Sequence, residues 1–281
     1  MGFGTYATIA DIKGVLGITS TTDDTIIRKI AEAASRSIDQ YTNRRFYVTS
    51  ETKYFDGAVR LWIPDLLSIN ASGLTTDEDG DGTFENTFAT TDYITYGTGL
   101  EDSLNTFPYI RLEISEDSDY SSFASGVKKG VKIIGSWGYG DGISALPYIT
   151  SNTVTYYALL ATGTAVDVAN IATSLLSPGQ NILIDSEQMY IYSITPDTAT
   201  VERGVNGTTA ATHVISSIIY IYQYPADIRQ ACIDLSVALY QNRTKRGLQS
   251  ERLGDYAYTL SKEYITNLLD DSIRSYKRMR V

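Results

Sequence analysis

Hydrophobic positions follow a helical period at both ends of this 281-residue chain and an alternating period between them. Near the start, Thr8 and Asp11 have the spacing of a capping box, and Gly17 follows the last apolar position. Ile9, Ile12, Val15 and Leu16 would face inward. A second stripe, capped by Asp23 or Asp24, comprises Ile26, Ile30, Ala34 and Ile38, widened by Ile27, Ala31 and Tyr41. The sequence therefore predicts two helices within residues 8–43, joined closely enough to pack antiparallel.

The helical period returns at Pro225, which suits the first position of a helix. The apolar face of this helix would comprise Ile228, Ala231, Cys232, Leu235, Ala238 and Leu239, with Gly247 ending it. A final helix is predicted from near Ser250 or after Gly254, with Tyr256, Leu260, Tyr264 and Leu268 inward. Short helices are marginal alone in water, so we expect the two ends to fold together.

The residues between the helical ends alternate as strands do, and glycines separate the strands. Candidate strands are 46–55, 59–63, 84–88, 92–96, 109–115 and 130–138, then 153–160, 181–185, 188–194, 198–202 and 217–223. A glycine-rich stretch at 135–142 marks the end of the first group. The expected fold is α+β, with terminal helices forming a four-helix-type bundle and two looped-out β-rich domains. The predicted domains are a helical core of residues 1–45 and 224–281, a first β domain of 46–142 and a second of 143–223.

The formal charge of −10 argues against general adhesion to DNA or anionic lipid, because like charges repel. The distribution is uneven, since the last eight residues contain four cations and no acid. No run of roughly 18 apolar residues is present, and residues 1–6 lack the pattern of a secretory signal. We therefore expect a soluble protein made in the cytoplasm.

Motifs of catalysis are missing from the sequence. His213 is the only histidine, and neither a nucleophile elbow, a zinc-protease helix nor a phosphate loop accompanies it. We predict a hydrogen bond that stabilises a turn for His213, no enzymatic activity and no cofactor. Cys232, the only cysteine, falls on an apolar helical stripe and is expected to be a buried small hydrophobe. Glu187 and Arg203, on successive strands, could pair across the sheet.

An acidic run offers the best candidate for a metal site. Asp77, Asp79 and Asp81 alternate as calcium ligands do at the start of an EF-hand loop. The twelfth position, however, is Phe88 instead of the bidentate glutamate, and strands are predicted on both sides. The other interpretation is an acidic hairpin turn that uses Gly80 and Gly82.

Four segments together resemble one protein family. They are residues 23–46 (DDTIIRKIAEAASRSIDQYTNRRF), 224–235 (YPADIRQACIDL), 239–247 (LYQNRTKRG) and 250–256 (SERLGDY). In this order they resemble the head-to-tail connector, or adaptor, proteins of long-tailed double-stranded DNA phages, over residues 1–142 and 224–281. Shorter members pass almost directly over residues 143–223, so this chain has an inserted domain. Residues 179–213 are similar to a small β module of phage structural proteins, which serves assembly or decoration.

The resemblance implies a structural, non-enzymatic virion protein at the head-to-tail junction, assembled in the host cytoplasm. Family members form a ring, usually twelvefold, beneath the portal, and this ring encloses the channel for DNA ejection. Their C-terminal tail commonly docks onto the portal, which implies that role for Arg274, Tyr276, Lys277, Arg278, Arg280 and Val281. The other interpretation of these cations is a solvated helix end that suits the helix dipole.

The expected partners are the portal protein, a tail-side completion protein and further copies of the chain. DNA would pass close by without specific binding, an acidic channel wall would reduce its adhesion, and no membrane is involved. One alternative is a tail completion or tail-terminator protein, which would bind the tail tube instead of the portal. A second is a monomeric glycan-binding β module, suggested by the 22 tyrosines.

Overall fold

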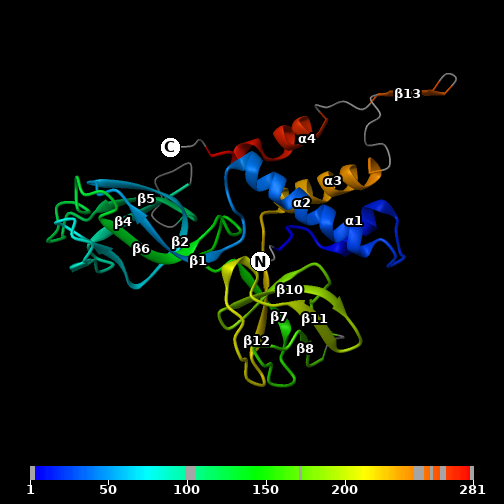
Figure 1. The fold of residues 1–281 in the computed structure, drawn as a ribbon, viewed down its shortest axis with the longest axis horizontal. Helices are drawn as coiled ribbons and strands as arrows, with labels where there is room; N and C mark the ends of the chain where they lie inside the picture. Colours follow the sequence, from blue (N-terminus) through cyan, green and yellow to red (C-terminus); the bar gives the residue numbers. More distant parts are fainter. Residues whose placement is uncertain are drawn as a thin grey trace. The chain divides into compact units, whose positions relative to one another are not determined.

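The computed structural model describes residues 4–98, 106–170, 173–243, 250–253, 256–259 and 264–278. The chain divides into two compact units. Unit 1 comprises Met1–Arg44 and Tyr148–Val281, and unit 2 comprises Arg45–Pro147. Figure 1 shows the helices and one of the two large β-sheets in unit 1, and the other large sheet in unit 2.

Unit 1 begins with two helices, α1 (Ile9–Leu16) and α2 (Asp24–Thr42). The predicted capping box is present, because Thr8 and Asp11 each bond the backbone of the other, and Gly17 ends α1 with a left-handed φ of 68°. The side chains of Ile27, Ala31, Ala34, Ser35, Ile38 and Thr42 are buried along α2. This stripe fixes which face of α2 the rest of unit 1 covers.

Helix α3 (Ala226–Gln241) packs against α1 and α2, so the two ends of the chain meet. Arg229 pairs with Asp11, with 2.9 Å between Nη2 and Oδ1. Cys232 is buried and lies 3.4 Å from the Ser35 hydroxyl. Burial raises the pKa of the Cys232 thiol, as expected for a small hydrophobe inside a core.

The sheet of unit 1 has the order β7-β12-β9-β10-β11-β8, and all of its pairs are antiparallel. Its strands are β7 (Tyr148–Val154), β8 (Ala165–Asp167), β9 (Asn181–Ile184), β10 (Glu187–Ile194), β11 (Thr198–Glu202) and β12 (Ile218–Tyr222). A bridge between Thr155 and Val168 joins the two outer strands, and Tyr156 N donates to Asp167 O at 2.8 Å. The sheet therefore closes into a small barrel, which leaves fewer unpaired strand edges. We call residues 148–222 the β7–β12 barrel.

The barrel interior is filled by aliphatic side chains that alternate along its strands. The buried cluster comprises Leu159, Val166, Val168, Ile182, Ile184, Met189, Ile191, Ala199, Val201, Ile219 and Ile221. Residues near the N-terminus join this barrel to the helices: the Tyr6 ring lies 4.8 Å from Tyr224, and Arg28 of α2 lies 4.7 Å from the Tyr192 ring. Gly179 permits the close approach, since a Cβ there would lie 2.7 Å from Ile9 N.

Unit 2 is a second antiparallel sheet with the order β1-β6-β2-β5-β4, and β3 pairs with β2. Its strands are β1 (Thr49–Phe55), β2 (Arg60–Thr76), β3 (Asn86–Thr87), β4 (Tyr93–Gly97), β5 (Tyr109–Ile114) and β6 (Val131–Trp137). Alternate residues of β6 are buried, from Val131 to Trp137, as expected for a strand with one face on a core. Trp137, Phe88 and Phe123 are the largest buried side chains of that core.

The prediction of a four-helix-type bundle is wrong, although helix and strand are mixed as predicted. The described chain is mostly β, with two six-stranded antiparallel sheets, and α1 and α4 (Tyr264–Ile273) have only 8 and 10 residues. Residues expected to begin the last helix instead form the strand pair β13 (Ser250–Leu253) and β14 (Tyr256–Thr259). Tyrosine and threonine, which favour strands, make up three of the four residues of β14.

The buried stripe of α1 and α2 also differs from the prediction. Val15 and Ile26, both expected inward, are exposed, whereas Ile27, which was expected to widen the stripe, is fully buried. The helix period alone cannot show which edge of a wide stripe the neighbouring elements cover. The strand β8 was not predicted, and β2 continues past the predicted end at residue 63 to Thr76, with register shifts that accommodate the extra residues.

Candidate assembly site

The basic segment at the C-terminus is attached by its backbone to the end of α2. Helix α4 continues into a short 3-10 helix, η3 (Arg274–Tyr276). Beyond it, Arg278 N donates to Thr42 O at 2.8 Å, and Arg44 Nε donates to Tyr276 O at 2.7 Å. These bonds give the segment a fixed path beside the last turn of α2.

Side chains of α2 and α4 reinforce this attachment. The Tyr41 hydroxyl donates to Asp270, and Lys277 Nζ lies 4.9 Å from the centre of the Tyr41 ring. Loss of solvent and the neighbouring Asp270 carboxylate raise the pKa of Tyr41 to about 12. Ile273 is completely buried, so the end of α4 is part of the core of unit 1.

The cations of this segment differ in how they are used. Arg274 and Lys277 are exposed, and Arg274 forms no ion pair within the described part of the chain. Tyr276 reaches the first turn of α3, where its hydroxyl lies 3.4 Å from Asp227 Oδ2. Arg280 and Val281, which the resemblance also assigns to the tail, lie outside the described residues. The structure therefore places Arg274, Tyr276, Lys277 and Arg278 together, and their role in binding stays a prediction.

Arg44, which was not predicted from the sequence, also helps to hold the C-terminal segment. It follows the left-handed residue Asn43, which ends α2, so its side chain can turn back toward the terminal segment. The last turn of α2 has no basic residue of its own. Cations from Arg44 and the terminal segment therefore lie where the helix dipole is negative. The dipole accounts for part of their placement without any partner.

The acidic run of unit 2 forms a tight loop. Carboxylate oxygens of Asp77, Asp79, Asp81 and Glu85 lie within 4.8 Å of one another. Asp77 accepts from the backbone of Gly80 at 2.6 Å and of Gly82 at 2.8 Å, and both glycines have positive φ. Burial raises the pKa of Asp77, but the backbone amides that donate to its carboxylate outweigh this effect. The pKa of Asp77 is therefore lower than its usual value. The acids thus shape a turn, and calcium binding stays a prediction.

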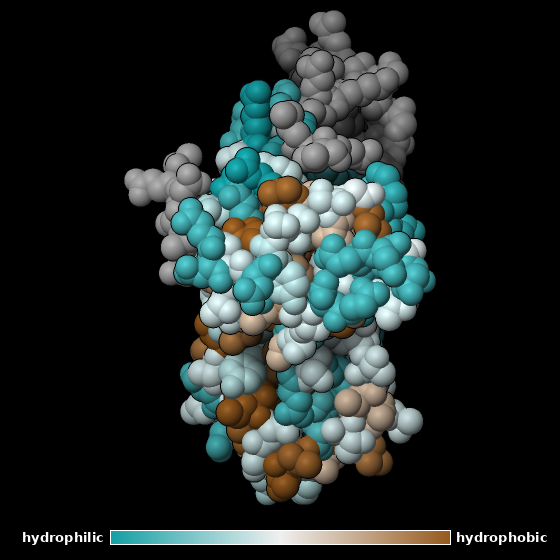
Figure 2. Space-filling model, turned by 90° about the vertical axis from the view of Figure 1, so that its left-hand side faces the viewer, coloured by the Kyte–Doolittle hydropathy of each residue, from teal (hydrophilic) through white to brown (hydrophobic). Residues whose placement is uncertain are grey.

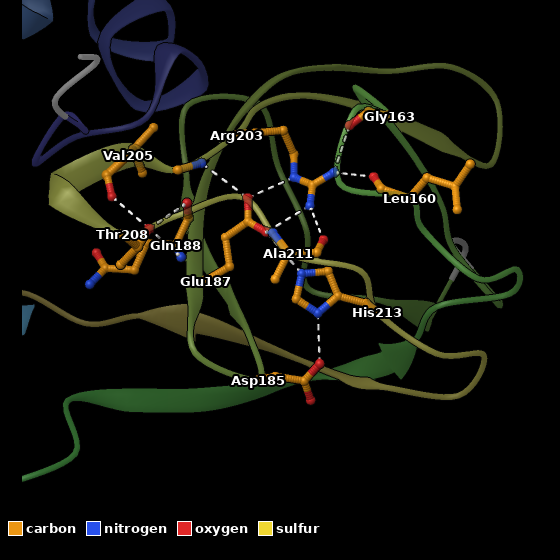
Figure 3. A network of polar contacts seen from close by, with 11 residues as sticks. Leu160, Gly163, Asp185, Glu187, Gln188, Arg203, Val205, Thr208, Ala211 and His213 are labelled. Carbon is orange, nitrogen blue, oxygen red and sulfur yellow. Dashed lines mark hydrogen bonds and ion pairs between the residues drawn. The ribbon is translucent and has the colours of Figure 1, made fainter.

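The β7–β12 barrel contains a buried polar network around Glu187, which Figure 3 shows from close by. The Glu187 side chain is fully buried and takes two bonds from Arg203, at 2.7 Å from Nε and 2.6 Å from Nη2. The amides of Gly204 and Ala211 also donate to it, at 3.0 and 2.8 Å. The predicted pairing of Glu187 with Arg203 is therefore present, with bidentate geometry.

His213 extends this network toward the surface (Figure 3). Its ring nitrogens lie 2.6 Å from Asp185 Oδ2 and 2.9 Å from Glu187 Oε2, and the ring is 1% exposed. Both partners that the described residues give to this ring are carboxylates, so no hydroxyl or thiol stands where His213 could activate it. The backbone of His213 also pairs with Leu159. This arrangement orders the chain around it, as a structural hydrogen bond does.

Comparison with known families identifies one part of the chain. Residues 6–79 match the phage gp6-like head-tail connector protein family. This match confirms the resemblance to phage head-tail connectors and supports a structural protein of the connector. The matched residues include α1, α2, β1 and β2. They therefore include Thr42 and Arg44, to which the C-terminal segment is bound.

Other comparisons gave no match. Neither a curated protein nor a solved structure resembles the chain closely enough to count as similar. Among the helices of the described residues, none has the length and apolar character needed to cross a membrane.

Proposed function

We propose that this protein is a subunit of a phage head-to-tail adaptor ring that binds beneath the portal and encloses the DNA exit channel. The single observation that carries the proposal is the connector family match over residues 6–79. The basic terminal segment, bound to the end of α2 within that match, supplies a surface for the portal. The ring would be twelvefold, non-enzymatic and located at the head-to-tail junction of the virion.

The terminal segment suits docking because its backbone is already ordered. Hydrogen bonds of Tyr276 O and Arg278 N fix the chain, while the side chains of Arg274 and Lys277 remain exposed. A segment that is ordered before binding loses less conformational entropy when it docks. An acidic portal surface would complement these cations.

The net charge suits a channel for DNA. With −10 on the whole chain and cations concentrated at the C-terminus, most of the chain is acidic. An acidic wall repels phosphates, so DNA would pass without adhering. DNA retention by the assembled ring that weakens steeply with salt would contradict this part of the proposal.

Binding to purified portal protein tests the proposal directly. The variant Arg274→Glu/Lys277→Glu should bind the portal much more weakly than the wild type, with the loss concentrated at low salt. A matched control is Lys128→Glu/Lys129→Glu, which makes the same change in charge at exposed lysines of unit 2. Melting curves should show that both variants are folded at the assay temperature, with at most a small loss for the terminal variant, which gives up the exposed contact of Lys277 with the Tyr41 ring.

Two results would contradict the proposal. Wild-type protein that does not bind the portal, but binds tail tubes, would favour a tail completion or tail-terminator protein. Equal weakening by the terminal and control variants would show that only net charge matters, and it would remove the specific role of the terminal segment.

A further inference from the structure

Hydrophobic side chains remain uncovered at one end of the β7–β12 barrel. Two neighbouring segments carry them: residues 155–160, after β7, and residues 213–217, before β12. We call the set Tyr156, Tyr157, Leu160, Val214 and Ile215 the barrel tip. All five are more than half exposed, from 54% for Tyr156 to 68% for Val214. Figure 2 shows hydrophobic residues gathered at the lower end of the view, where Figure 1 draws this barrel.

Hydrogen bonds to the rest of the barrel order the backbone of the barrel tip. Leu159 and His213 exchange two backbone hydrogen bonds of 2.9 and 2.8 Å. The backbone of Thr155 donates to Ser217 O and accepts from Ser216 N. Arg203, whose charge is paired with Glu187, donates to Leu160 O at 2.8 Å. The buried network of Figure 3 therefore ties both segments to the barrel. An ordered apolar surface without a cover is typical of a protein interface.

Charge restricts what the barrel tip can bind. Residues 148–223 contain no lysine and one arginine, Arg203, whose side chain is only 7% exposed and paired. The same residues contain the acids Asp167, Asp185, Glu187, Asp197 and Glu202. Asp185 is exposed beside His213, and Asp167 O bonds Tyr156 N. The complementary surface is therefore apolar with cations around it.

A surface of this description lies on the helices of the same chain. A groove of about 350 Å³ runs between α2 and α3 and is lined by Ile26, Lys29, Ile30, Ala33, Leu239 and Arg243. We call it the helix groove. Its apolar residues include Ile26, which was predicted to face inward and is instead 44% exposed. Lys29 supplies an exposed cation, and Arg243, which lies 3.7 Å from Asp23, supplies a second, so the helix groove complements the barrel tip in apolar character and in charge.

The barrel tip lies at the end of the barrel away from the helices of its own chain. It adjoins the Ile218 end of β12, whereas the other end, Tyr222, stacks on Tyr224 beside the N-terminal segment. The five residues of β12 separate these ends by about 14 Å at the usual rise of a strand. We infer that the barrel tip of one copy occupies the helix groove of a second copy.

Such a contact joins two different surfaces, and it repeats from copy to copy. Heterologous contacts of this kind build rings when the rotation closes. The inference deepens the proposed function, on which it rests, because it gives the inserted barrel a place in the assembly. It assigns to residues 143–223 the role of joining neighbouring subunits.

Cross-linking between two cysteine variants tests the inference in the full-length chain. Ile215→Cys places a thiol on the barrel tip, and Ala33→Cys places one in the helix groove. The native Cys232 is buried and should not react. A 1:1 mixture at high protein concentration, treated with a short bismaleimide, should yield a mixed dimer, while either variant alone should yield little. Thr195→Cys, exposed elsewhere on the barrel, replaces Ile215→Cys as the control and should not cross-link to Ala33→Cys.

Charge provides a second test of the same contact. Lys29→Glu in the Ala33→Cys chain should lower the yield of mixed dimer severalfold, and Lys128→Glu in that chain should not. A mixture that gives no more product than the Thr195→Cys control would overturn the inference, as would dimers that form equally well from Ile215→Cys alone. Portal binding without this cross-link would support the proposed function and refute the copy-to-copy contact. The cross-link without portal binding would support the copy-to-copy contact and refute the adaptor role.

Discussion

The substitution Arg203→Met should destabilise unit 1 strongly. Among the described residues, Arg203 forms the ion pair with the buried Glu187 carboxylate, and it also donates to Leu160 O, Gly163 O and Ala211 O. Methionine keeps the length of the side chain but supplies neither the charge nor the donors. It would leave Glu187 charged and buried without its ion-pair partner.

The magnitude follows from the burial of the pair. Removing one partner of a buried ion pair costs about 3–5 kcal/mol, because the other charge is left uncompensated. For a folding unit of this size, that loss lowers the melting temperature by roughly 6–20 °C. The double variant Glu187→Gln/Arg203→Met should recover part of the loss, since no unpaired charge remains.

Differential scanning calorimetry measures the effect, provided that the two units are followed as separate transitions. Only the transition of unit 1 should move. The control Lys128→Met breaks an ion pair between Lys128 and Asp56 that is exposed on unit 2, and it should change melting little. A melting temperature within about 2 °C of wild type for Arg203→Met would refute the reasoning, because a cost of about 1 kcal/mol is typical of an exposed pair.

Three further predictions concern pH, packing and calcium. Burial raises the pKa of Glu187, but the hydrogen bonds from Arg203 and from the amide of Ala211 outweigh this effect, so the pKa of Glu187 is lower than its usual value. The stability that Glu187 contributes is therefore present above its unfolded pKa of about 4.3 and is lost as pH falls through the folded value. Denaturant titrations from pH 7 to pH 3 should show a smaller loss for Glu187→Gln than for the wild type. Gly57→Ala should destabilise unit 2 by about 1–3 kcal/mol in urea unfolding, because the new Cβ would lie 1.6 Å from Ala124 O. Calcium should leave the melting temperature of unit 2 unchanged, because Asp77 already accepts two backbone amides, and a rise would establish the calcium site instead.

Local signals in the sequence predicted the elements that local chemistry determines. The capping box of Thr8 and Asp11 and the end of α1 at Gly17 depend on neighbours within one turn. The strand β11 occupies the predicted residues 198–202, between turn residues on both sides. Helix α3 follows Pro225, and five of its six predicted apolar positions are buried. Each of these features is decided within about ten residues.

Tertiary contacts decided the features that the sequence left open or that we predicted wrongly. Ile26 lies on the wide apolar stripe of α2, but the stripe alone does not show that Ile27 is buried and Ile26 exposed once α3 packs against α2. The closure of the barrel through the bridge between Thr155 and Val168 depends on how the chain folds back between them, which hydrophobic periodicity does not describe. The helical pattern of residues 250–270 led to a four-helix bundle, although Tyr256–Thr259 form a strand.

The candidate assembly site was predicted only in part. Four cations without an acid made the terminal segment conspicuous in the sequence. Its attachment to Thr42 and Arg44 was not foreseen, because these residues are more than 200 positions away. The Asn-Arg-Arg sequence directly after α2 is the signal that could have indicated it, since a left-handed residue there turns the chain beside the helix end.

Cryo-electron microscopy of the phage vertex tests the central claim most directly. We predict a ring of this chain between portal and tail, with the segment around Arg274 and Lys277 against the portal. Each β7–β12 barrel should contact the α2 and α3 helices of the next copy. A vertex in which the layer beneath the portal contains no copy of this chain would contradict the account.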